Sequence, residues 1–588
     1  MSNYGLIGNS TFGALIDCHS KIVFSCLGGF SSDPIFNCLL NGNSEESGFF
    51  NISLSNLSRT DQKYIPNTPI LITTMISNKN DILQVKDFAP RFSLYDRAHR
   101  PFQIFRIVTR VRGDPMIKVK VRPSFEYNAN DGFTTRGSHH IRFCGPHAVW
   151  RLTTNASIQT ILDETEILLN EPLYFVFGQD ETFSQSLSQV CKDFEDRTIN
   201  FWRNFVNNLT LPLDFQEDIT RAAITLALLQ SDECGGVVGA LTFGLGNGGG
   251  VDRRACDLLE ISTSLSVLRS IGMHAFVRKF TEFMKMICLS EKTLQGVYGD
   301  LGETEIPQKN CEFLAGFPGE PVISGGLGQW SNSQGGLCGI FFIALVGAFF
   351  DLRMRDLCSP QLQSKLEQLA DIALKDFNCF NRNQSMGFYF EGIENEEKLT
   401  FEAVLCWAAA DRISKLFNKL KNLQKCNIWR KHAISIKTDI IKYATDTQRG
   451  SLNSYWNTIE STRYTGPSML RLAEIGFLEP NDPWFLSTVK AFEDDFFSNY
   501  KTHTLTKINK PIPTCTALWY AEALRSTGRG QEARTIFETM CRSLTECQQI
   551  AEYFNFSNGE WSGDVPFTRA LLSFLRLGPR LSRQWQYL

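Results

Sequence analysis

The stretch QSLSQVCKDFEDRTINFWRNFVNN, residues 185–208, is where the pattern of the chain changes. Leu187, Val190, Phe194, Phe201 and Phe205 recur at helical spacing, which predicts an amphipathic helix here. The segments before this stretch lack that spacing, and the apolar segments after about residue 215 have it. The sequence therefore predicts a β-rich domain over residues 1–184, a linker helix within 185–215 and a helical domain over 216–588.

Short alternating or β-branched segments fill the first 184 residues. Examples are residues 22–24, 70–74, 102–108 and 117–121, and turn residues such as those at 113–115 separate them. In residues 117–121 apolar side chains alternate with lysines, as expected for a strand with one buried and one solvated face. Many short strands without an intervening helical period predict a β-sandwich.

The second part of the chain carries a dozen helical patterns. They lie at residues 216–232, 256–272, 274–289, 335–352, 360–377, 399–420, 428–444, 465–475, 483–498, 514–526, 530–545 and 564–576. Twelve amphipathic helices suit an (α/α)6 barrel, in which six inner and six outer helices alternate and loops build a pocket at one end. A helical solenoid is the alternative, but the sequence shows no fixed repeat length. The predicted fold class is mainly α: a β-sandwich followed by an (α/α)6 barrel.

Composition excludes several classes of protein. The 59 Lys and Arg nearly balance the 62 Asp and Glu, giving a net charge of −3, so nothing supports a nucleic-acid partner. A hydrophobic content of 43% excludes global disorder. The longest apolar run, residues 337–350, is too short to span a bilayer and predicts a buried helix. We therefore expect neither a nucleic-acid nor a membrane partner.

The cysteines and the N-terminus both suggest a cytoplasmic protein. The 17 cysteines contain no CxxC pair, which leaves zinc ribbons and thioredoxin-like motifs unsupported. The first ten residues, MSNYGLIGNS, lack the basic and apolar regions of a signal peptide. We expect free thiols in a reducing cytosol.

Two cofactor-like patterns are better explained by structure. The glycine-rich run at 244–250 contains a GxGxxG match, but a dinucleotide site needs a preceding strand, and the pattern before this run is helical. We interpret it as a flexible loop at the barrel mouth that could act as a lid. His139, His140 and His147 lie among predicted strands without a matching Cys or Asp cluster, so we expect no metal. No cofactor is implied.

The order of elements and a series of short motifs resemble glycoside hydrolase family 15, the glucoamylase-like and trehalase-like enzymes. The motifs lie at residues 3–9, 13–17, 30–34, 399–401, 404–407, 411–412, 476–478, 482–483, 519–524, 528–529, 532–534, 559–560, 563 and 566. Each motif alone is weak. Their order and spacing over more than 500 residues make the resemblance specific, and it implies a β-sandwich followed by the helical barrel.

The resemblance implies two catalytic glutamates. Glycoside hydrolysis usually needs one carboxyl to protonate the leaving oxygen and another to activate water or attack carbon. Glu391, in the aromatic run 387–392, lies eight residues before Leu399 and matches the family's acid; its aromatic neighbours favour a protonated carboxyl. Glu552 precedes Gly559 and matches the family's base. The alternative for both is a solvated surface glutamate.

The residues that would hold the sugar match the family only in part. Asp252 and Arg254 match, but Val251 replaces a Trp, Leu259 replaces the sugar-binding Arg, and Glu260 is the only equivalent of that arginine's Asp partner. Leu cannot replace the bidentate contacts of an arginine. The resemblance thus implies a substrate site that contains Asp252, Arg254, Glu260, Tyr389 and Trp330.

Three functions follow from this mixture. The first is inverting hydrolysis of an α-linked glucoside, with a saccharide as the small-molecule partner. The second is a lyase, isomerase or cyclase-like reaction in which a protonated glutamate acts on a less polar substrate. The third is a non-catalytic binding relative. Polarity around Val251 and Leu259 discriminates the first two, because a sugar site presents several converging donors and acceptors.

Overall fold

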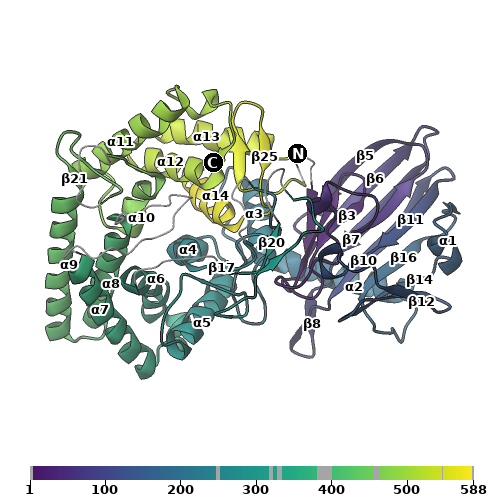
Figure 1. Cartoon of the computed structure of the whole chain (residues 1–588), viewed down its shortest axis with the longest axis horizontal. Helices are drawn as coiled ribbons and strands as arrows, with labels where there is room; N and C mark the ends of the chain where they lie inside the picture. Colours follow the sequence, from purple (N-terminus) through teal and green to yellow (C-terminus); the bar gives the residue numbers. More distant parts are fainter. Residues whose placement is uncertain are drawn as a thin grey trace.

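The computed structural model describes residues 4–246, 252–316, 322–326, 334–380, 400–455, 463–545 and 547–585. Strands occupy one end of the molecule and helices the other (Figure 1). This arrangement confirms the predicted fold class. The domain limits at residues 184 and 215 stay a prediction.

Two antiparallel sheets form the N-terminal β-sandwich. The smaller has the order β1 (Tyr4–Gly8), β2 (Gly13–Asp17), β3 (Lys21–Ser25), β4 (Phe49–Leu54), β11 (Met116–Arg122) and β15 (Ile167–Leu168). The larger has the order β12 (Phe133–Arg136), β13 (His140–Cys144), β14 (Val149–Thr154), β16 (Leu173–Gln179), β10 (Gln103–Arg112), β7 (Ile82–Phe88), β6 (Leu71–Ser77) and β5 (Leu57–Tyr64). A hairpin of β8 (Phe92–Leu94) and β9 (Arg97–His99) and the short helices η1 (Cys38–Asn41), η2 (Glu126–Asn128) and α1 (Ile158–Leu162) complete this part.

Apolar side chains from both sheets fill the sandwich. Ile52 of β4 and Val85 of β7 belong to one buried cluster. On β11 the apolar residues Ile117 and Val119 are buried, while the lysine between them is partly exposed. The alternation in the sequence therefore gives the strand its inner and outer faces.

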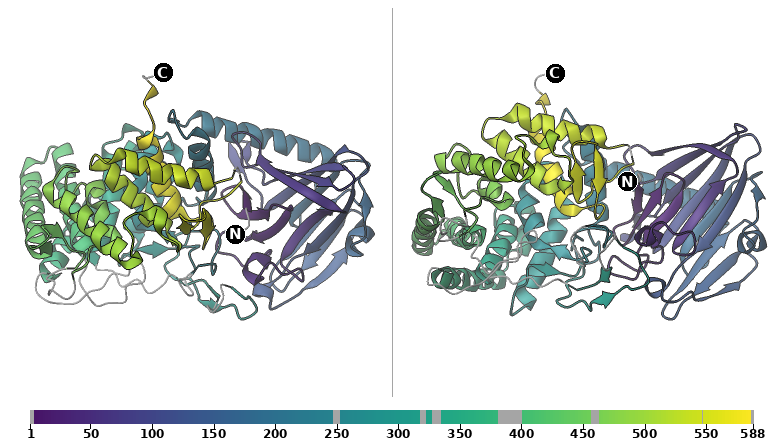
Figure 2. Two further views of the ribbon diagram at one scale, coloured as in Figure 1. Left: turned by 90° about the horizontal axis from the view of Figure 1, so that it is seen from above. Right: turned by 45° about the horizontal axis from the view of Figure 1, so that its top comes forward.

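The long helix α2 (Leu187–Asn207) runs along the β-sandwich (Figure 2). Ser186 caps it by accepting a hydrogen bond from the backbone N–H of Gln189. Val190 packs on the strands, whereas Trp202 and Val206 join the core of the helical part. A helix thus lies within the segment 185–215, and its most buried face is centred on Val190, Trp202 and Val206.

All twelve predicted helices of the second part are present. They are α3 (Gln216–Leu228), α4 (Leu258–Ser270), α5 (His274–Ser290), α6 (Gln334–Leu345), α7 (Pro360–Phe380), α8 (Thr400–Lys419), α9 (Leu423–Ala444), α10 (Leu472–Ile475) extending η6 (Pro467–Arg471), α11 (Pro483–Tyr500), α12 (Thr514–Ser526), α13 (Gly530–Ser543) and α14 (Thr568–Leu581). Helices α4, α6, α8, α12 and α14 and the η6–α10 segment form the inner ring, and the other six pack outside it. The inner helices α6 and α8 are buried almost all round, because they face both the barrel axis and the outer helices.

Short elements decorate the loops of the barrel. They are β17 (Cys256–Asp257), β18 (Val297–Tyr298), β19 (Lys309–Asn310), β20 (Ile323–Ser324), β21 (Thr445–Asp446), β22 (Ser451–Leu452), β23 (Ile512–Pro513), β24 (Tyr553–Asn555), β25 (Glu560–Ser562), η3 (Val346–Phe349), η4 (Leu352–Leu357) and η7 (Leu505–Lys507). In the described parts of the chain, no helix combines the length and apolarity needed to cross a membrane. The cysteines are free thiols, as predicted.

One buried carboxylate joins the two halves of the molecule. Asp232, in the loop after α3, forms ion pairs with Arg91 and Arg100 of the N-terminal part, each at 2.9 Å, and with Lys279 of α5. Burial alone would raise the pKa of Asp232, but Arg91 and Lys279 outweigh it and lower the pKa to about 2. Asp232 is therefore an electrostatic link whose loss leaves three cations without their shared partner.

We expect Asp232→Asn to destabilise the protein by about 2–3 kcal/mol at pH 7. Because the folded pKa is lower than the unfolded value, this stabilisation is present above about pH 4 and is lost as the pH falls toward 2. Urea unfolding of wild type and variant between pH 3 and 8 tests this. Asn substituted for the exposed Asp61 is the control. A wild type–variant difference that stays constant across the whole range would refute the linkage.

Candidate active site

Glu552 is fixed at one end of the barrel by its own backbone. Its N–H donates to the carbonyl of Asp564 at 3.1 Å, and its carbonyl accepts the N–H of Thr514 at 2.8 Å. Thr514 begins α12, and Asp564 lies shortly before α14. Glu552 thus sits beside the N-terminal ends of two inner helices, directly before strand β24.

The carboxylate of Glu552 is buried, with 6% of the residue exposed. Its Oε1 forms an ion pair with Nη2 of Arg253 at 2.9 Å, and its Oε2 accepts the N–H of Asp564 at 3.4 Å. The guanidinium of Arg253 lies over the ring of Phe567, 5.6 Å from its centroid. Glu552 is therefore not a solvated surface glutamate but a buried carboxylate paired with Arg253, and its role as the base stays a prediction.

Two glycines pack against Glu552 at positions where a side chain would collide with it. A Cβ on Gly246 would lie 2.7 Å from Oε2 of Glu552, and a Cβ on Gly563 would lie 2.9 Å from Cβ of Glu552. Gly563 also has a φ of +83°, which disfavours any side chain. Both positions therefore require glycine if Glu552 is to keep its place.

We expect Gly246→Ala to reduce kcat on the protein's substrate by about tenfold or more, because the new methyl group must push the Glu552 carboxylate aside. The displaced atom ends a flexible side chain, so stability should change little. Gly530→Ala, where the Cβ meets open space, is the control. Steady-state kinetics with thermal unfolding checks this. Equal kcat in the two variants would contradict it.

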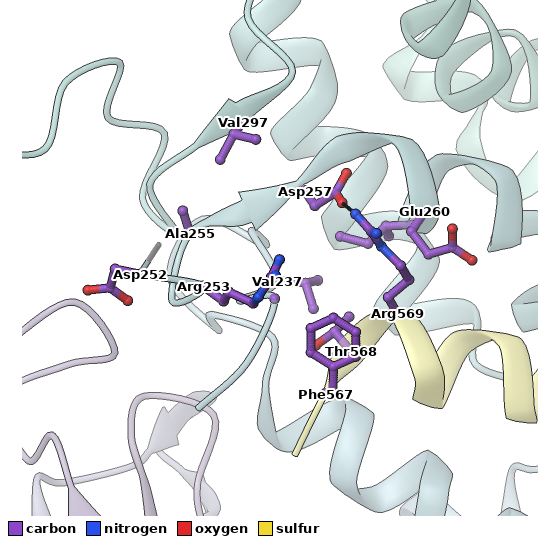
Figure 3. Close-up of a pocket in the computed structure, with 12 residues that line it drawn as sticks. Val237, Asp252, Arg253, Ala255, Asp257, Glu260, Val297, Phe567, Thr568 and Arg569 are labelled. Atoms are coloured by element: carbon purple, nitrogen blue, oxygen red, sulfur yellow. Dashed lines mark hydrogen bonds and ion pairs between the residues drawn. The ribbon is translucent and has the colours of Figure 1, made fainter. Parts of the chain in front are cut away.

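A small cavity lies next to Arg253 (Figure 3). Arg569, at the start of α14, donates from Nη2 to Oδ2 of Asp257 at 2.6 Å, so a second arginine–carboxylate pair faces the same space. Two predicted site residues, Asp252 and Glu260, also line this cavity, and the remaining lining residues are Val237, Gly239, Ala255, Ile261, Val297, Phe567 and Thr568. Its free volume of about 40 Å³ holds a few water molecules, whereas ligand pockets usually reach roughly 300 Å³ or more, so this cavity alone is too small for a typical ligand.

Comparison with known proteins finds relatives over almost the whole chain. No protein-family model matches the chain. A trehalase from Thermoplasma volcanium is 21% identical, over 98% of this chain and 93% of that protein. A trehalase from Mycobacterium tuberculosis is 20% identical, over 96% of this chain and 87% of that protein. Among solved structures, a bacterial glucoamylase complexed with acarbose superposes with a TM-score of 0.66 at 10% identity, covering 98% of this chain and 93% of that chain.

The chain is thus similar to trehalases over almost its whole length, and it shares the fold of a solved glucoamylase. The resemblance seen in the motifs is therefore confirmed over the whole length. The solved glucoamylase also confirms the architecture, a β-sandwich followed by the helical barrel.

In this protein, Asp252 and Arg254 bind each other. Nη2 of Arg254 lies 2.6 Å from Oδ2 of Asp252. Arg254 also donates to the carbonyl of Ser32 in the β-sandwich and to Oγ of Ser324, each at 2.8 Å, and the N–H of Gly325 donates to Asp252 at 2.7 Å. Both side chains are buried in contacts that join the two halves of the molecule. Their predicted contact with substrate stays a prediction.

Glu260 points away from Arg253 and into the barrel (Figure 3). Its Oε2 pairs with Nη1 of Arg471 at 2.9 Å, and Oγ of Ser573 donates to its Oε1 at 3.4 Å. Burial raises the pKa of Glu260, although Arg471 and Arg576 oppose that shift. Leu259 is buried in the apolar core. Glu260 thus belongs to an ionic cluster inside the barrel, and its predicted role in substrate binding stays a prediction.

The remaining predicted site residues, Glu391, Tyr389 and Trp330, lie outside the described residues, as does Val251. Of the two predicted catalytic glutamates, only Glu552 is therefore among the described residues. The described residues contain no cluster of three or more His, Cys, Asp or Glu side chains placed to hold a metal ion.

The sequence analysis missed three groups that the structure places near Glu552 or in the cavity beside Arg253: Arg253 itself, Asp564 and the Asp257–Arg569 pair. Arg253 stands between the two matched residues Asp252 and Arg254, and Asp564 directly follows the matched Gly563. A charged residue inside a matched motif was thus the available signal. Asp257 and Arg569 are more than 300 positions apart, and only the fold joins them.

Proposed function

We propose that this protein is a glycoside hydrolase that cleaves an α-linked glucoside with inversion of configuration at the anomeric carbon. The observation that carries the proposal is the buried carboxylate of Glu552, held by Arg253 at 2.9 Å where the inner helices α12 and α14 begin. A base that activates water needs a carboxylate in a fixed direction, and this ion pair provides one.

In the proposed reaction Glu391 donates its proton to the glycosidic oxygen as the bond from that oxygen to the anomeric carbon breaks. Glu552 takes a proton from a water molecule, whose oxygen forms the new bond to the opposite face of that carbon. The products are two hydroxyl compounds, and the two glutamates exchange their protonation states. In inverting enzymes such carboxyls stand about 6.5–9.5 Å apart, which leaves room for the water.

The charges around the cavity favour a saccharide over an apolar substrate. Arg253, Asp257 and Arg569 present donors and acceptors beside the ring of Phe567, a combination suited to the hydroxyl edges and the apolar face of a sugar. Leu259, which stands where the family has a sugar-binding arginine, is buried in the core rather than lining this cavity. Arg253 and Arg569 thus provide guanidinium groups for sugar hydroxyls in place of the arginine that Leu259 replaces.

Trehalose is the first substrate to test, because the relatives over the full length are named trehalases. Maltose is the second, since the structural neighbour is named a glucoamylase. We place the reaction in the cytoplasm and assign it no cofactor.

The test is a glucose-release assay of the full-length chain with trehalose, maltose and p-nitrophenyl α-glucoside. We expect the wild type to hydrolyse at least one of them and Glu391→Gln to lose that activity. Glu367→Gln, on a partly exposed helix position of α7, is the control. Failure of the wild type on every α-glucoside, or full activity of Glu391→Gln, would overturn the proposal.

A further inference from the structure

A second buried carboxyl lies beside Glu552. Asp564 is 3% exposed. Its Oδ1 accepts the N–H of Leu245 at 3.2 Å and the hydroxyl of Thr242 at 3.3 Å. The same hydroxyl accepts the N–H of Val565 at 2.8 Å, so Thr242 is held by two consecutive residues of this turn.

The segment that Asp564 holds leads directly to the glutamate. Leu245 precedes Gly246, the residue whose backbone faces Oε2 of Glu552. The backbone of Asp564 binds Glu552 from the other side, because its N–H donates to that same oxygen and its carbonyl accepts the N–H of Glu552. The main chain of Asp564 thus binds Glu552 directly. Its side chain binds Thr242 and Leu245, in the segment that packs against the Glu552 carboxylate.

We propose that Asp564 is a positioning residue for Glu552. Its side chain binds the 242–246 segment to the turn that contains Asp564, and this contact sets the direction of the Glu552 carboxylate. The proposal rests on the proposed function, in which that direction decides how well water is activated. Asp564 itself need not touch substrate.

The surroundings of Asp564 favour its neutral form. Burial raises the pKa of Asp564, and the carboxylates of Glu552 and Asp252 raise it further, while Arg253 opposes them. Two adjacent buried carboxyls repel each other when both are charged, which favours the protonated form. We therefore expect Asp564 to keep its proton up to a higher pH than a solvated aspartate does.

Two substitutions separate position from charge. Asp564→Asn keeps an oxygen that accepts from Leu245 and Thr242 and has no charge, so we expect kcat within about threefold of the wild type. Asp564→Ala removes the acceptor, so we expect kcat to fall tenfold or more, with KM changed less than threefold. Full activity of the Ala variant, or an Asn variant as impaired as the Ala variant, would overturn the proposal.

Thermal unfolding tests the same residue without any substrate. For a carboxyl whose folded pKa lies above its unfolded value, stability is greatest at low pH and falls as the pH rises from about 4 through the folded pKa. Asp564→Asn removes that loss, so we expect its Tm to exceed that of the wild type by an amount that grows from pH 4 to pH 8. Glu560→Gln, at an exposed carboxyl in strand β25 four residues before Asp564, should show no such trend.

This second measurement keeps the two proposals apart. If no glycoside is hydrolysed but the Asn variant shows the pH-dependent gain, the proposed function fails while the neutral, buried Asp564 stands. If hydrolysis is found but the Tm difference is independent of pH, Asp564 is charged in the folded protein and the inference fails.

Discussion

Glu552→Gln is expected to lower kcat by about 10²–10⁴-fold, the usual contribution of a general base. The amide keeps the size of the side chain and an oxygen for the N–H of Asp564, but it cannot take a proton from water. The ion pair with Arg253 is lost at the same time. Initial rates of glucose release, measured with substrate well above KM, give kcat directly.

Glu560→Gln is the matched control for this variant, since it makes the same change on an exposed side chain in the same hairpin. It should keep the activity of the wild type. If Glu552→Gln retained more than about half of the wild-type kcat, Glu552 would not be the base, and its ion pair with Arg253 would have only a structural role.

Arg471→Met is expected to destabilise the protein by about 3–5 kcal/mol. Arg471 is fully buried and pairs with both Glu260 and Glu474, at 2.9 and 3.1 Å. Its Nη2 also donates to Oγ1 of Thr263 at 2.7 Å, and its guanidinium lies over Trp519, 4.7 Å from the ring centroid. Without it, Glu260 is left buried without its cation. Urea unfolding followed by tryptophan fluorescence measures the loss.

Arg525→Met provides the comparison, because Arg525 pairs with Glu522 in a half-exposed position. That change should cost about 1 kcal/mol or less. Adding Glu260→Gln to Arg471→Met should recover part of the lost stability, since it removes the unpaired charge. If both Arg→Met variants lost the same free energy of unfolding, the buried cluster around Glu260 would stabilise the protein no more than an ordinary surface ion pair.

Much of the fold could be predicted because buried residues are apolar and recur with the period of the strand or helix that contains them. The alternation at residues 117–121 gives β11, and the switch to helical spacing after residue 185 gives α2. All twelve barrel helices follow from the same spacing. Their ends were less predictable: α9 begins at Leu423 rather than near residue 428, because Asn422 caps it by accepting the N–H of Lys425.

The sequence could predict which residues occupy the motif positions of the candidate site, but not what each side chain contacts. Glu552 was found by its position in a motif, and the structure shows that it is buried and paired. Asp252 and Arg254 matched the family and Glu260 matched it in part, yet the described ion pairs of all three are with other protein groups. A charged side chain in a motif looks the same in the sequence whether it faces a ligand or a partner across the core.

Contacts between distant segments could not be predicted at all. Arg253 and Glu552 are 299 positions apart, and Thr242 lies more than 300 positions before Asp564. Neither segment has a periodicity that points to the other. Only closure of the barrel, which brings the chain before α4 next to the chain before α14, places these groups together.

Proton NMR of trehalose during its hydrolysis tests the central claim most directly, because it reads the configuration of each glucose as it is released. The two glutamates acting as acid and base predict inversion, so each cleavage yields one α-glucose and one β-glucose before mutarotation mixes them. Release of α-glucose alone would mean retention, which needs a glycosyl-enzyme intermediate, and would contradict the role assigned to Glu552.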